Sequence, residues 1–249
     1  MSKNVRLQRL DALIVERGLA GSLAKAQAMI LAGEVSVDGR RADKSGARFL
    51  PQSSIEITTR SGKFVSRGGL KLEGALEDFA IDPHALACID IGASTGGFTD
   101  CLLQRGAARV YAVDVNLDQL AWKLRQDHRV IRISRNARQL RSTDIPEPAD
   151  LLVFDVSFIS VSKVLPAALA VAKHSADFLI LVKPQFELPR EDVGPGGIVS
   201  RPALHQKAIA AVRETAVRLG LHILAVAPSR LPGAEGNLEY FLHARKTLR

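Results

Sequence analysis

Residues 88–100 read Cys-Ile-Asp-Ile-Gly-Ala-Ser-Thr-Gly-Gly-Phe-Thr-Asp. The apolar start predicts a buried strand, the glycine-rich middle predicts a tight turn, and the segment from Phe98 onward predicts the first turn of a helix. This order places backbone N–H groups and a helix N-terminus next to glycines that leave room for a ligand. The stretch therefore indicates a nucleotide-binding crossover, with a purely structural turn as the alternative.

Length and composition bound what the chain can be. The 249 residues are enough for one α/β domain and a smaller second one, and 47% apolar with 24% charged residues is typical of a globular protein. No apolar run approaches the roughly 18 residues of a membrane span, and the N-terminus has no apolar signal core. Cys88 and Cys101 fit neither a disulfide framework nor a zinc site. We therefore expect a cytoplasmic protein with no metal and no membrane partner.

The positive charge is concentrated near the N-terminus. Residues 1–71 hold 13 Lys and Arg against 6 Asp and Glu, whereas the remainder holds 21 against 20. A basic module on a nearly neutral body is the electrostatic footprint of nucleic-acid binding, because lysine and arginine displace the counterions of phosphates. The alternative is a basic surface that is merely solvated.

Residues 1–60 have the pattern of a small α+β module. We expect a first amphipathic helix around Leu10, a second helix from an N-cap at Ser22 to Gly33, and short strands at 35–37 and near Ile55. The pattern, with Arg6-Leu-Gln-Arg-Leu-Asp11 and Val35-Ser-Val-Asp-Gly39, resembles the alpha-L RNA-binding domain of a small-subunit ribosomal protein. The resemblance implies a phosphate-facing side that carries Arg6, Arg9, Lys25, Arg40 and Arg41.

Residues 61–69 read as a connector, because they mix glycine, serine and basic residues. Arg67 in this connector joins the predicted RNA-binding residues. Residues 70–249 then alternate helices and strands. The expected strands lie near 88–90, 110–114, 129–133, 151–155, 178–182, 222–227 and 238–242. Seven strands with crossover helices predict a doubly wound α/β sheet, and the final antiparallel pair is typical of the class I methyltransferase variant of the Rossmann-like fold.

Charged side chains follow several of the expected strands. Asp114 ends the second strand 18 residues after Gly96, close to the spacing at which a carboxylate accepts hydrogen bonds from a ribose, in NAD and S-adenosylmethionine alike. Asp155 and Lys183 end the fourth and fifth strands, and the carboxyl ends of neighbouring parallel strands meet at one edge of a sheet. Apolar neighbours disfavour an ammonium, which suits a lysine acting as a general base. The alternative is a structural ion pair.

Motifs along nearly the whole chain resemble the TlyA family. They are Val65-Ser-Arg-Gly-Gly-Leu-Lys-Leu72, Asp90-Ile-Gly-Ala-Ser-Thr-Gly-Gly-Phe-Thr99, Asp155-Val-Ser-Phe-Ile-Ser160, Leu181-Val-Lys-Pro-Gln-Phe-Glu187, Val193-Gly-Pro-Gly-Gly197 and Gly236-Asn-Leu-Glu-Tyr-Phe241. This family was named for hemolysin, and its members are ribosomal-RNA 2′-O-methyltransferases with an FtsJ-like catalytic domain. The resemblance implies methylation of a cytidine ribose with S-adenosylmethionine as cofactor, in 23S rRNA and, in some members, also in 16S rRNA. Because the chain lacks the C-terminal extension of the longer members, 23S rRNA alone is favoured.

The resemblance also assigns site residues. The Lys-Asp-Lys-Glu tetrad of the family falls on Lys71, Asp155, Lys183 and Glu239, with Lys183 as the general base. The implied cofactor-binding residues are Asp90, Gly92, Ser94, Thr95, Gly96, Gly97, Phe98, Asp114, Asn136 and Asp155. One loop departs from the family, which often shows Glu-Arg-Thr-Asn-x-Arg where this chain has Ile133-Ser-Arg-Asn-Ala-Arg138 and keeps only Asn136 and the last arginine.

Three other classes of function are alternatives. A non-catalytic RNA-binding or ribosome-assembly factor would keep the basic module and the nucleotide fold without turnover. A membrane-lytic hemolysin would need a membrane-active segment, and a dehydrogenase would have no use for the tetrad or the basic module. The arginines that recur every three or four residues either extend an RNA surface or form a solvated face: Arg125, Arg129, Arg132, Arg135, Arg138 and Arg141. The sequence carries no signal for the oligomeric state.

Overall fold

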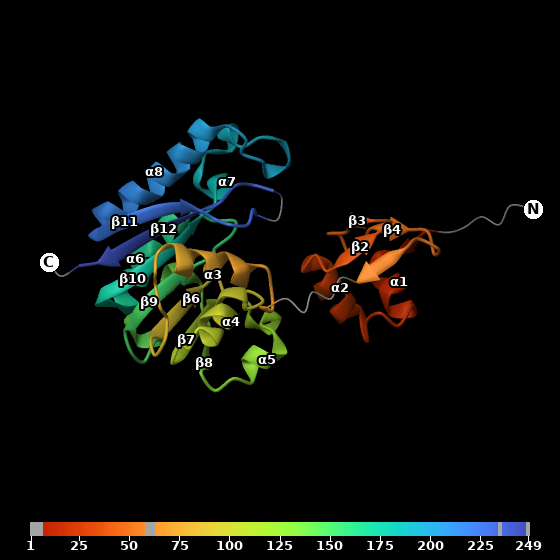
Figure 1. The fold of residues 1–249 in the computed structure, drawn as a ribbon, viewed down its shortest axis with the longest axis horizontal. Coiled ribbons are helices and arrows are strands. Elements are labelled where there is room, and N and C mark those ends of the chain that lie inside the picture. Colours follow the sequence, from red (N-terminus) through yellow and green to blue (C-terminus); the bar gives the residue numbers. More distant parts are fainter. Residues whose placement is uncertain (1–6, 58–62, 234–235, 248–249) are drawn as a thin grey trace, which may run out of the picture. The chain divides into compact units, whose positions relative to one another are not determined.

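The computed structural model describes residues 7–57, 63–233 and 236–247, and the chain divides into two compact units, Met1–Gly62 and Lys63–Arg249 (Figure 1). Each unit has a hydrophobic core of its own. Within the described ranges, no helix has both the length and the apolar character needed to cross a membrane.

The first unit is a small α+β module, as predicted. Its helices are α1 (Leu10–Glu16) and α2 (Leu23–Leu31). Its short strands are β1 (Gln8–Arg9), β2 (Val35–Val37), β3 (Arg40–Arg41), β4 (Arg48–Phe49) and β5 (Ile55–Ile57). Strand β2 pairs antiparallel with β3 and β5, and β1 pairs antiparallel with β4, a pair that the sequence pattern does not predict.

Local signals explain how the first unit folds. The Ser22 side chain accepts a hydrogen bond from the Lys25 backbone N–H at 3.2 Å, so it caps α2 as expected. Asp11 is fully buried on α1, where the Arg9 guanidinium donates two hydrogen bonds to its carboxylate at 3.0 and 2.7 Å. These bonds lower the pKa of Asp11 to about 2, so the buried carboxylate stays ionised and paired.

The second unit is built on a seven-stranded sheet, and every expected strand is present. The strands are β6 (Ala87–Ile91), β7 (Arg109–Asp114), β8 (Val130–Ser134), β9 (Ala149–Phe154), β10 (Ala172–Val182), β11 (Leu221–Pro228) and β12 (Tyr240–Lys246). Their order across the sheet is β11-β12-β10-β9-β6-β7-β8. Strand β12 runs antiparallel to both of its neighbours, and the pairs from β10 to β8 are parallel. This order and the reversed β12 confirm the predicted class I methyltransferase topology.

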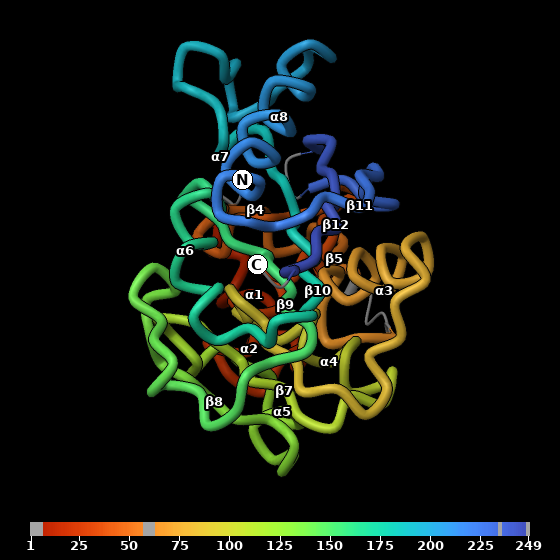
Figure 2. Tube along the Cα trace, turned by 90° about the vertical axis from the view of Figure 1, so that its left-hand side faces the viewer, coloured from red at the N-terminus to blue at the C-terminus, as the bar shows by residue number. Residues whose placement is uncertain are grey.

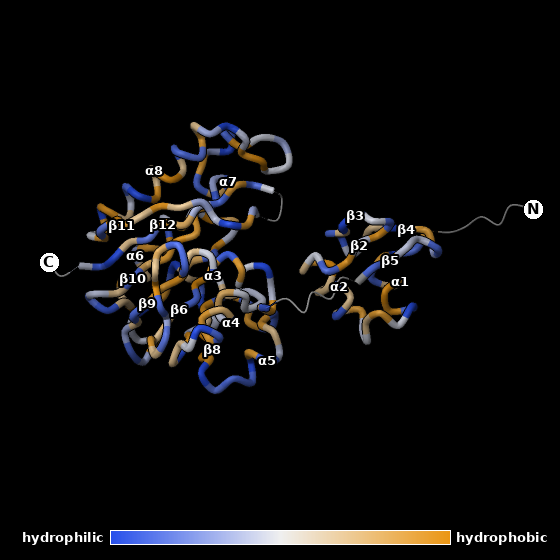
Figure 3. The backbone as a smooth tube through the Cα atoms, in the orientation of Figure 1, coloured by the Kyte–Doolittle hydropathy of each residue, from blue (hydrophilic) through white to orange (hydrophobic). Residues whose placement is uncertain are grey.

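Helices cover both faces of this sheet (Figures 1 and 2). On one face α3 (Gly68–Asp78), α4 (Gly97–Gln104) and α5 (Trp122–Arg125) share a core with the strands, and on the other α6 (Leu165–Ala168) and α8 (Pro202–Arg218) share a second one. The short helix α7 (Pro184–Glu187) follows β10. Along α8 apolar and polar residues alternate with the helical period, as Figure 3 shows, which buries one side of the helix.

Tight 3-10 turns complete the connections of the second unit. They are η1 (Leu117–Gln119), η2 (Ala137–Gln139), η3 (Ser142–Asp144), η4 (Val161–Lys163), η5 (Leu169–Val171), η6 (Arg190–Asp192) and η7 (Pro195–Gly197).

The segment 63–69, expected as part of a connector, lies within the second unit. Phe64 is buried in the core that α3 and α4 share. The Val65 backbone N–H donates to Asp100 Oδ2 on α4 at 2.7 Å, and Gln104 Nε2 donates to the Lys63 carbonyl at 2.7 Å. A single buried phenylalanine and two backbone anchors therefore place the start of this unit at Lys63 rather than at residue 70.

We predict that Phe64→Ala lowers the free energy of unfolding of the second unit by about 3 kcal/mol, because it removes a buried aromatic ring and leaves a cavity. Denaturant unfolding of the full chain measures the change. Val217→Ala, at an exposed position of α8, is the control and is expected to stay within about 0.5 kcal/mol. Equal changes in the free energy of unfolding for the two substitutions would show that residues 63–69 are a connector and not part of the second unit.

Candidate active site

Strand pairing brings three of the four predicted catalytic residues to one edge of the sheet. Asp155 directly follows β9, and Lys183 directly follows β10. The last pair between β10 and β12 is Val182 with Tyr240, so the next position along this antiparallel pair sets Lys183 opposite Glu239. The carboxyl edge of the sheet is where open α/β folds bind ligands.

The four residues form two ion pairs at this edge. Lys183 Nζ lies 2.6 Å from Asp155 Oδ1, and Lys71 Nζ lies 2.5 Å from Glu239 Oε2. Lys71, Lys183 and Glu239 are buried, whereas the side chain of Asp155 keeps 24% of its surface exposed. A cluster of two lysines and two carboxylates is neutral overall, and Asp155 is its most accessible member.

Helix α3 carries Lys71 to this edge, and one arginine fixes the helix there. Arg230, in the segment after β11, donates to Glu77 Oε2 at 2.7 Å and to Asp78 Oδ1 at 2.6 Å, both at the end of α3. Its side chain also lies close over Gly74, where a Cβ atom would come within 2.8 Å of Arg230 Cδ. The segment that leads to Glu239 is thereby tied to the helix that carries Lys71.

Two residues that contact Lys183, and a third that contacts one of them, were missed by the sequence reasoning. Lys183 Nζ donates to Ser157 Oγ at 2.8 Å and lies 5.9 Å from the centre of the Phe186 ring. Phe158 is 93% exposed, has a φ of +64°, and its ring centre lies 5.4 Å from that of Phe186. The signal available was position alone, since Ser157 and Phe158 follow Asp155 and Phe186 follows Lys183 in the motifs already quoted.

The glycine-rich turn after β6 approaches Asp155 closely. Gly92 has a φ of +91°, and a Cβ atom there would lie 2.6 Å from the Asp155 carbonyl oxygen. Gly96 has a φ of +95° at the start of α4, where a Cβ atom would overlap Leu124 Cδ1 at 2.2 Å. The backbone N–H of Ser94 donates to Asp114 Oδ2 at 2.9 Å, which links this turn to the end of β7. The predicted turn and the predicted ribose carboxylate therefore lie side by side.

Asp90 lies in β6 beneath this turn and is fully buried. Its Oδ2 accepts hydrogen bonds from the Thr99 backbone N–H at 2.8 Å and from Thr99 Oγ1 at 2.7 Å, whereas its Oδ1 has no partner among the described residues. Burial raises the pKa of Asp90 to about 7, against the lowering effect of the Thr99 bonds.

The remaining predicted cofactor residues divide into two groups. Thr95 and Asn136 are exposed, Asn136 two residues beyond the end of β8, where its side chain accepts from the Arg138 backbone N–H at 3.0 Å. Gly97 and Phe98 are buried at the start of α4, and the Phe98 ring stacks on Phe241 in the core with centroids 6.2 Å apart. The Phe98 ring thus packs inward, and only its backbone faces the turn.

The predicted RNA-binding residues differ in how free their charges are. Lys25, Arg40 and Arg41 are exposed on the first unit, whereas Arg9 is bound to Asp11 on two nitrogens. Arg67 lies in the second unit, just before α3. Arg6 lies outside the described residues.

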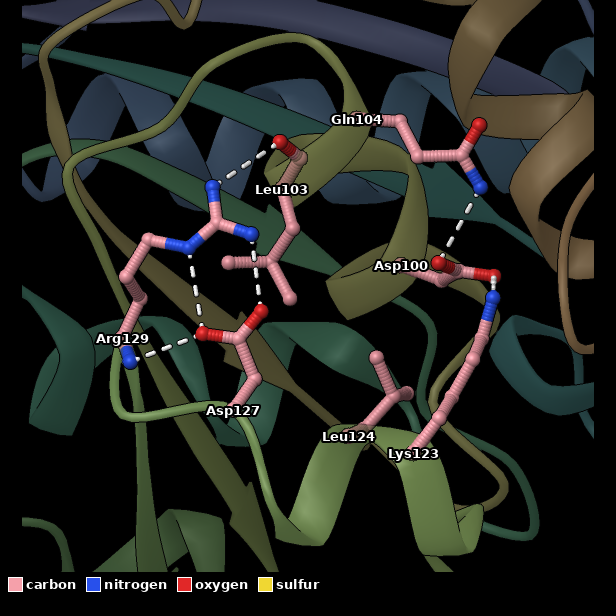
Figure 4. Close-up of a pocket in the computed structure, with 7 residues that line it drawn as sticks. All are labelled: Asp100, Leu103, Gln104, Lys123, Leu124, Asp127 and Arg129. Atoms are coloured by element: carbon pink, nitrogen blue, oxygen red, sulfur yellow. Dashed lines mark hydrogen bonds and ion pairs between the residues drawn. The ribbon is translucent and has the colours of Figure 1, made fainter.

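A cavity of about 260 Å³ lies between α4, α5 and the segment before β8 (Figure 4). It is lined by Asp100, Leu103, Gln104, Lys123, Leu124, Asp127 and Arg129. Its charged groups pair with each other, Lys123 with Asp100 at 2.9 Å and Arg129 with Asp127 at 2.7 Å. None of the four predicted catalytic residues lines it, so we place the candidate site at the carboxyl edge of the sheet instead.

Comparison with known proteins agrees with this geometry. Residues 64–246 match the FtsJ-like methyltransferase family, and residues 8–53 match the S4 domain. The chain is 48% identical over 242 residues to the 16S/23S rRNA (cytidine-2′-O)-methyltransferase TlyA of Mycobacterium tuberculosis, covering 96% of this chain and 90% of that protein. The chain belongs to the TlyA family of FtsJ-like methyltransferases. The predicted resemblance is thereby confirmed.

Other relatives of this TlyA-family chain carry the name hemolysin. Hemolysin A of Brachyspira hyodysenteriae is 40% identical, covering 94% of this chain and 98% of that protein. The solved structure of a Streptococcus thermophilus protein described as a hemolysin is similar with a TM-score of 0.76 at 39% identity, covering 98% of this chain and 90% of that chain. That protein, described as a hemolysin, has the same fold as this chain.

We predict that Asp90 makes the second unit less stable as pH rises from about 4 to 7. The folded state holds the Asp90 proton up to a pKa of about 7, and the unfolded chain releases it near 4, so the free energy of unfolding falls by about 1.4 kcal/mol per pH unit in this window. Asp90→Asn removes the titration and keeps an oxygen for Thr99.

Denaturant unfolding of wild type and Asp90→Asn at pH 5, 6, 7 and 8 measures this difference. The variant is expected to gain stability relative to wild type up to pH 7 and then to level off. Asp118→Asn, at an exposed position, is the control. A difference that does not change with pH would show that Asp90 is ionised throughout.

Proposed function

We propose that this protein transfers a methyl group from S-adenosylmethionine to the 2′-hydroxyl of a cytidine in ribosomal RNA, in 23S rRNA and with 16S rRNA as a second candidate. The observation that carries the proposal is the convergence of Lys71, Asp155, Lys183 and Glu239 at the carboxyl edge of a class I methyltransferase sheet. The Mycobacterium tuberculosis relative bears the name of this activity. A ribosomal substrate also places the protein in the cytoplasm.

The residues at the glycine-rich turn suit S-adenosylmethionine. Gly92 and Gly96 keep the turn free of side chains at positions where a Cβ atom would clash, and the exposed Ser94 and Thr95 lie between them. Asp114, at the end of β7, is the acceptor for ribose hydroxyls. Asp90 is fully buried beneath the turn, and through Oδ2 it holds Thr99 at the start of α4. When bound, the cofactor supplies a methyl group on a positively charged sulfur, and Asp155 is the accessible carboxylate next to the turn that stabilises this charge.

The contacts of Lys183 suit a general base. A neutral lysine amine has two N–H groups and one lone pair; Lys183 donates one N–H to Ser157 Oγ at 2.8 Å, and its Nζ lies 2.6 Å from Asp155 Oδ1, which holds the amine at this edge. The lone pair then remains for the proton of the ribose 2′-hydroxyl. The amine accepts that proton only in its unprotonated form, and a cation bound beside Asp155 disfavours a second positive charge at this place.

Glu239 and Lys71 support this arrangement from the other side. Glu239 faces Lys183 across the β10–β12 pair, and Lys71 neutralises it at 2.5 Å, so the carboxylate is buried as half of an ion pair. A buried carboxylate that loses its partner is costly, which keeps the Glu239 side chain in one place. We therefore propose that Glu239 and Lys71 orient the ribose and the Lys183 amine.

The first unit suits the recognition of RNA. It matches the S4 domain, and Lys25, Arg40 and Arg41 are exposed on it. Exposed cations on a small module bind the phosphates of RNA independently of the base sequence. Methyl transfer then requires that one nucleotide of the bound RNA reach the site. The rival function, an RNA-binding assembly factor without turnover, requires the same module but gives the buried tetrad no role.

We predict that Lys183→Ala lowers the rate of methyl transfer by a factor of about 100 to 10,000, because the hydroxyl proton loses its acceptor. Lys183→Arg is expected to be as inactive, since an arginine keeps the charge and has no lone pair to accept a proton. The measurement is the transfer of labelled methyl from S-adenosylmethionine to ribosomal subunits and to free rRNA that lack the modification.

Lys173→Ala is the matched control, because Lys173 also lies 2.6 Å from an aspartate, Asp150, but outside the site. It is expected to retain wild-type activity. Label on the large or the small subunit identifies the RNA that is modified. Tight binding of RNA and cofactor by the wild type without any transfer would favour the assembly factor.

We predict that Arg40→Ala with Arg41→Ala weakens the binding of rRNA at all sequences and reduces the salt dependence of log K by about 1 per lost phosphate contact. Both side chains are exposed on β3. RNA affinity measured across salt concentrations tests this, with Arg218→Ala on α8 as the control. An unchanged salt slope would place the RNA contact elsewhere on the chain.

A further inference from the structure

We infer that Trp122, Arg125 and Arg132 form a platform on which an unpaired base of the substrate RNA stacks, beside but not at the reacting nucleotide. The inference rests on the proposed function and deepens it, since it gives the catalytic unit an RNA contact of its own. We refer to these three residues as the Trp122 platform.

Trp122 begins α5 and is 68% exposed, an unusual position for the largest apolar side chain. Val115, in the segment between β7 and α5, is equally exposed at 68%. The Ala121 backbone N–H donates to the Thr95 carbonyl at 3.1 Å, so the residue before Trp122 is tied to the glycine-rich turn. The exposed indole therefore lies on the flank of the predicted cofactor site.

Positive charge without a partner lies next to this indole. The Arg125 guanidinium carbon is 5.3 Å from the centre of the Trp122 ring. Within the described ranges no carboxylate lies within 4.0 Å of Arg125 or Arg132, whereas Lys123 and Arg129 nearby are each paired with an aspartate. The two arginines thus keep their charge free beside an aromatic face.

Arg132 lies on the same side of the sheet as α5. Ile131 and Ile133 in β8 pack into the core that contains α6 and α8, and Val130 packs into the core that contains α4 and α5. Because side chains alternate along a strand, Arg132 shares the face of Val130. Figures 1 and 2 agree in placing α5 beside β8, and the two elements are in contact.

An exposed aromatic face with adjacent arginines matches the chemistry of single-stranded RNA. Every base has a π face that stacks on an indole, and guanidinium groups bind the phosphates on either side of that base. Either feature alone is common on protein surfaces. The two features occur together beside the site proposed to hold a ribose of RNA. We therefore infer that the ligand of the platform is an unpaired ribonucleotide.

The Trp122 platform lies far across the sheet from the proposed catalytic residue Lys183. Strand β8 lies four positions from β10, which at roughly 4.8 Å per strand is about 19 Å. A base on Trp122 therefore belongs to a nucleotide other than the methylated one in the bound RNA. Loss of the platform is expected to weaken substrate binding and to leave the chemical step intact.

Trp122 is the single tryptophan of the chain, so its fluorescence reports this surface directly. We expect a single-stranded oligocytidylate to quench the emission of the wild-type protein through stacking. Heparin, a polyanion without bases, is expected to cause little quenching. Quenching by S-adenosylhomocysteine alone, with none by the oligonucleotide, would overturn the inference and assign the indole to the cofactor.

Kinetics provide the second arm of the test. Trp122→Ala and Arg125→Ala are expected to raise KM for ribosomal substrate by about 5- to 100-fold and to leave kcat unchanged, while Trp122→Phe retains most of the affinity. Arg213→Ala, on α8 at the opposite face, is the control. An unchanged KM in Trp122→Ala would contradict the platform.

The two proposals fail in different ways. If the wild-type protein transfers no methyl group, the proposed function fails, and the fluorescence titration still decides whether RNA reaches Trp122. If methyl transfer proceeds and oligonucleotide binding leaves the emission unchanged, the platform alone is wrong.

Discussion

The antiparallel pairing of β12 with β10 is the contact on which the site depends. In a parallel sheet every strand ends at the ligand-binding edge, so Asp155 and Lys183 arrive there simply by following β9 and β10. Glu239 precedes its strand and would lie at the opposite edge if β12 were parallel. Because β12 is reversed, its first residues meet the last residues of β10, and Glu239 faces Lys183. A strand inserted against the direction of the sheet therefore supplies the fourth member of the cluster.

The four charged residues of the tetrad contribute little to the stability of the fold, so stability does not explain why they are placed together. Burial of two lysines and two carboxylates costs desolvation that their mutual attraction only partly returns, and apolar residues of similar volume would pack at least as well. The pairs lie at the rim of the sheet, whereas two clusters of buried apolar side chains cover its faces. Asp155, the most exposed member, faces the Gly92 turn. Charges that are costly to bury and that adjoin the Gly92 turn are consistent with the ligand-binding role proposed for them.

The sequence predicts the elements of this fold well and the side-chain partnerships less well. Apolar runs between turn residues identify all seven strands of the sheet, and position at strand ends identifies Asp155 and Lys183. Lys71 and Glu239 lie on a helix and before a strand, where no periodic pattern marks a functional residue, so only the family resemblance reaches them. Ser157 shares a motif with Asp155 but carries no charge to draw attention. Phe64 and Phe98 show the limit of local composition, because glycine-rich surroundings suggest a connector or a ligand contact and long-range packing buries both rings.

The distribution of arginines shows how a nearly neutral catalytic unit can hold RNA. Charge counted along the chain places most of the net positive charge in residues 1–71, yet pairing decides which charges are available. Arg9 in the first unit is satisfied by Asp11, while Arg125 and Arg132 in the second have no carboxylate partner among the described residues. RNA that binds to such surfaces, away from the reacting atoms, helps to position one ribose next to the methyl donor. These contacts add no charge to the site itself. Among the described residues, the charges of the tetrad pair with each other, whereas Arg125 and Arg132 have no carboxylate partner, so the proposed binding of RNA and the proposed chemical step use different side chains.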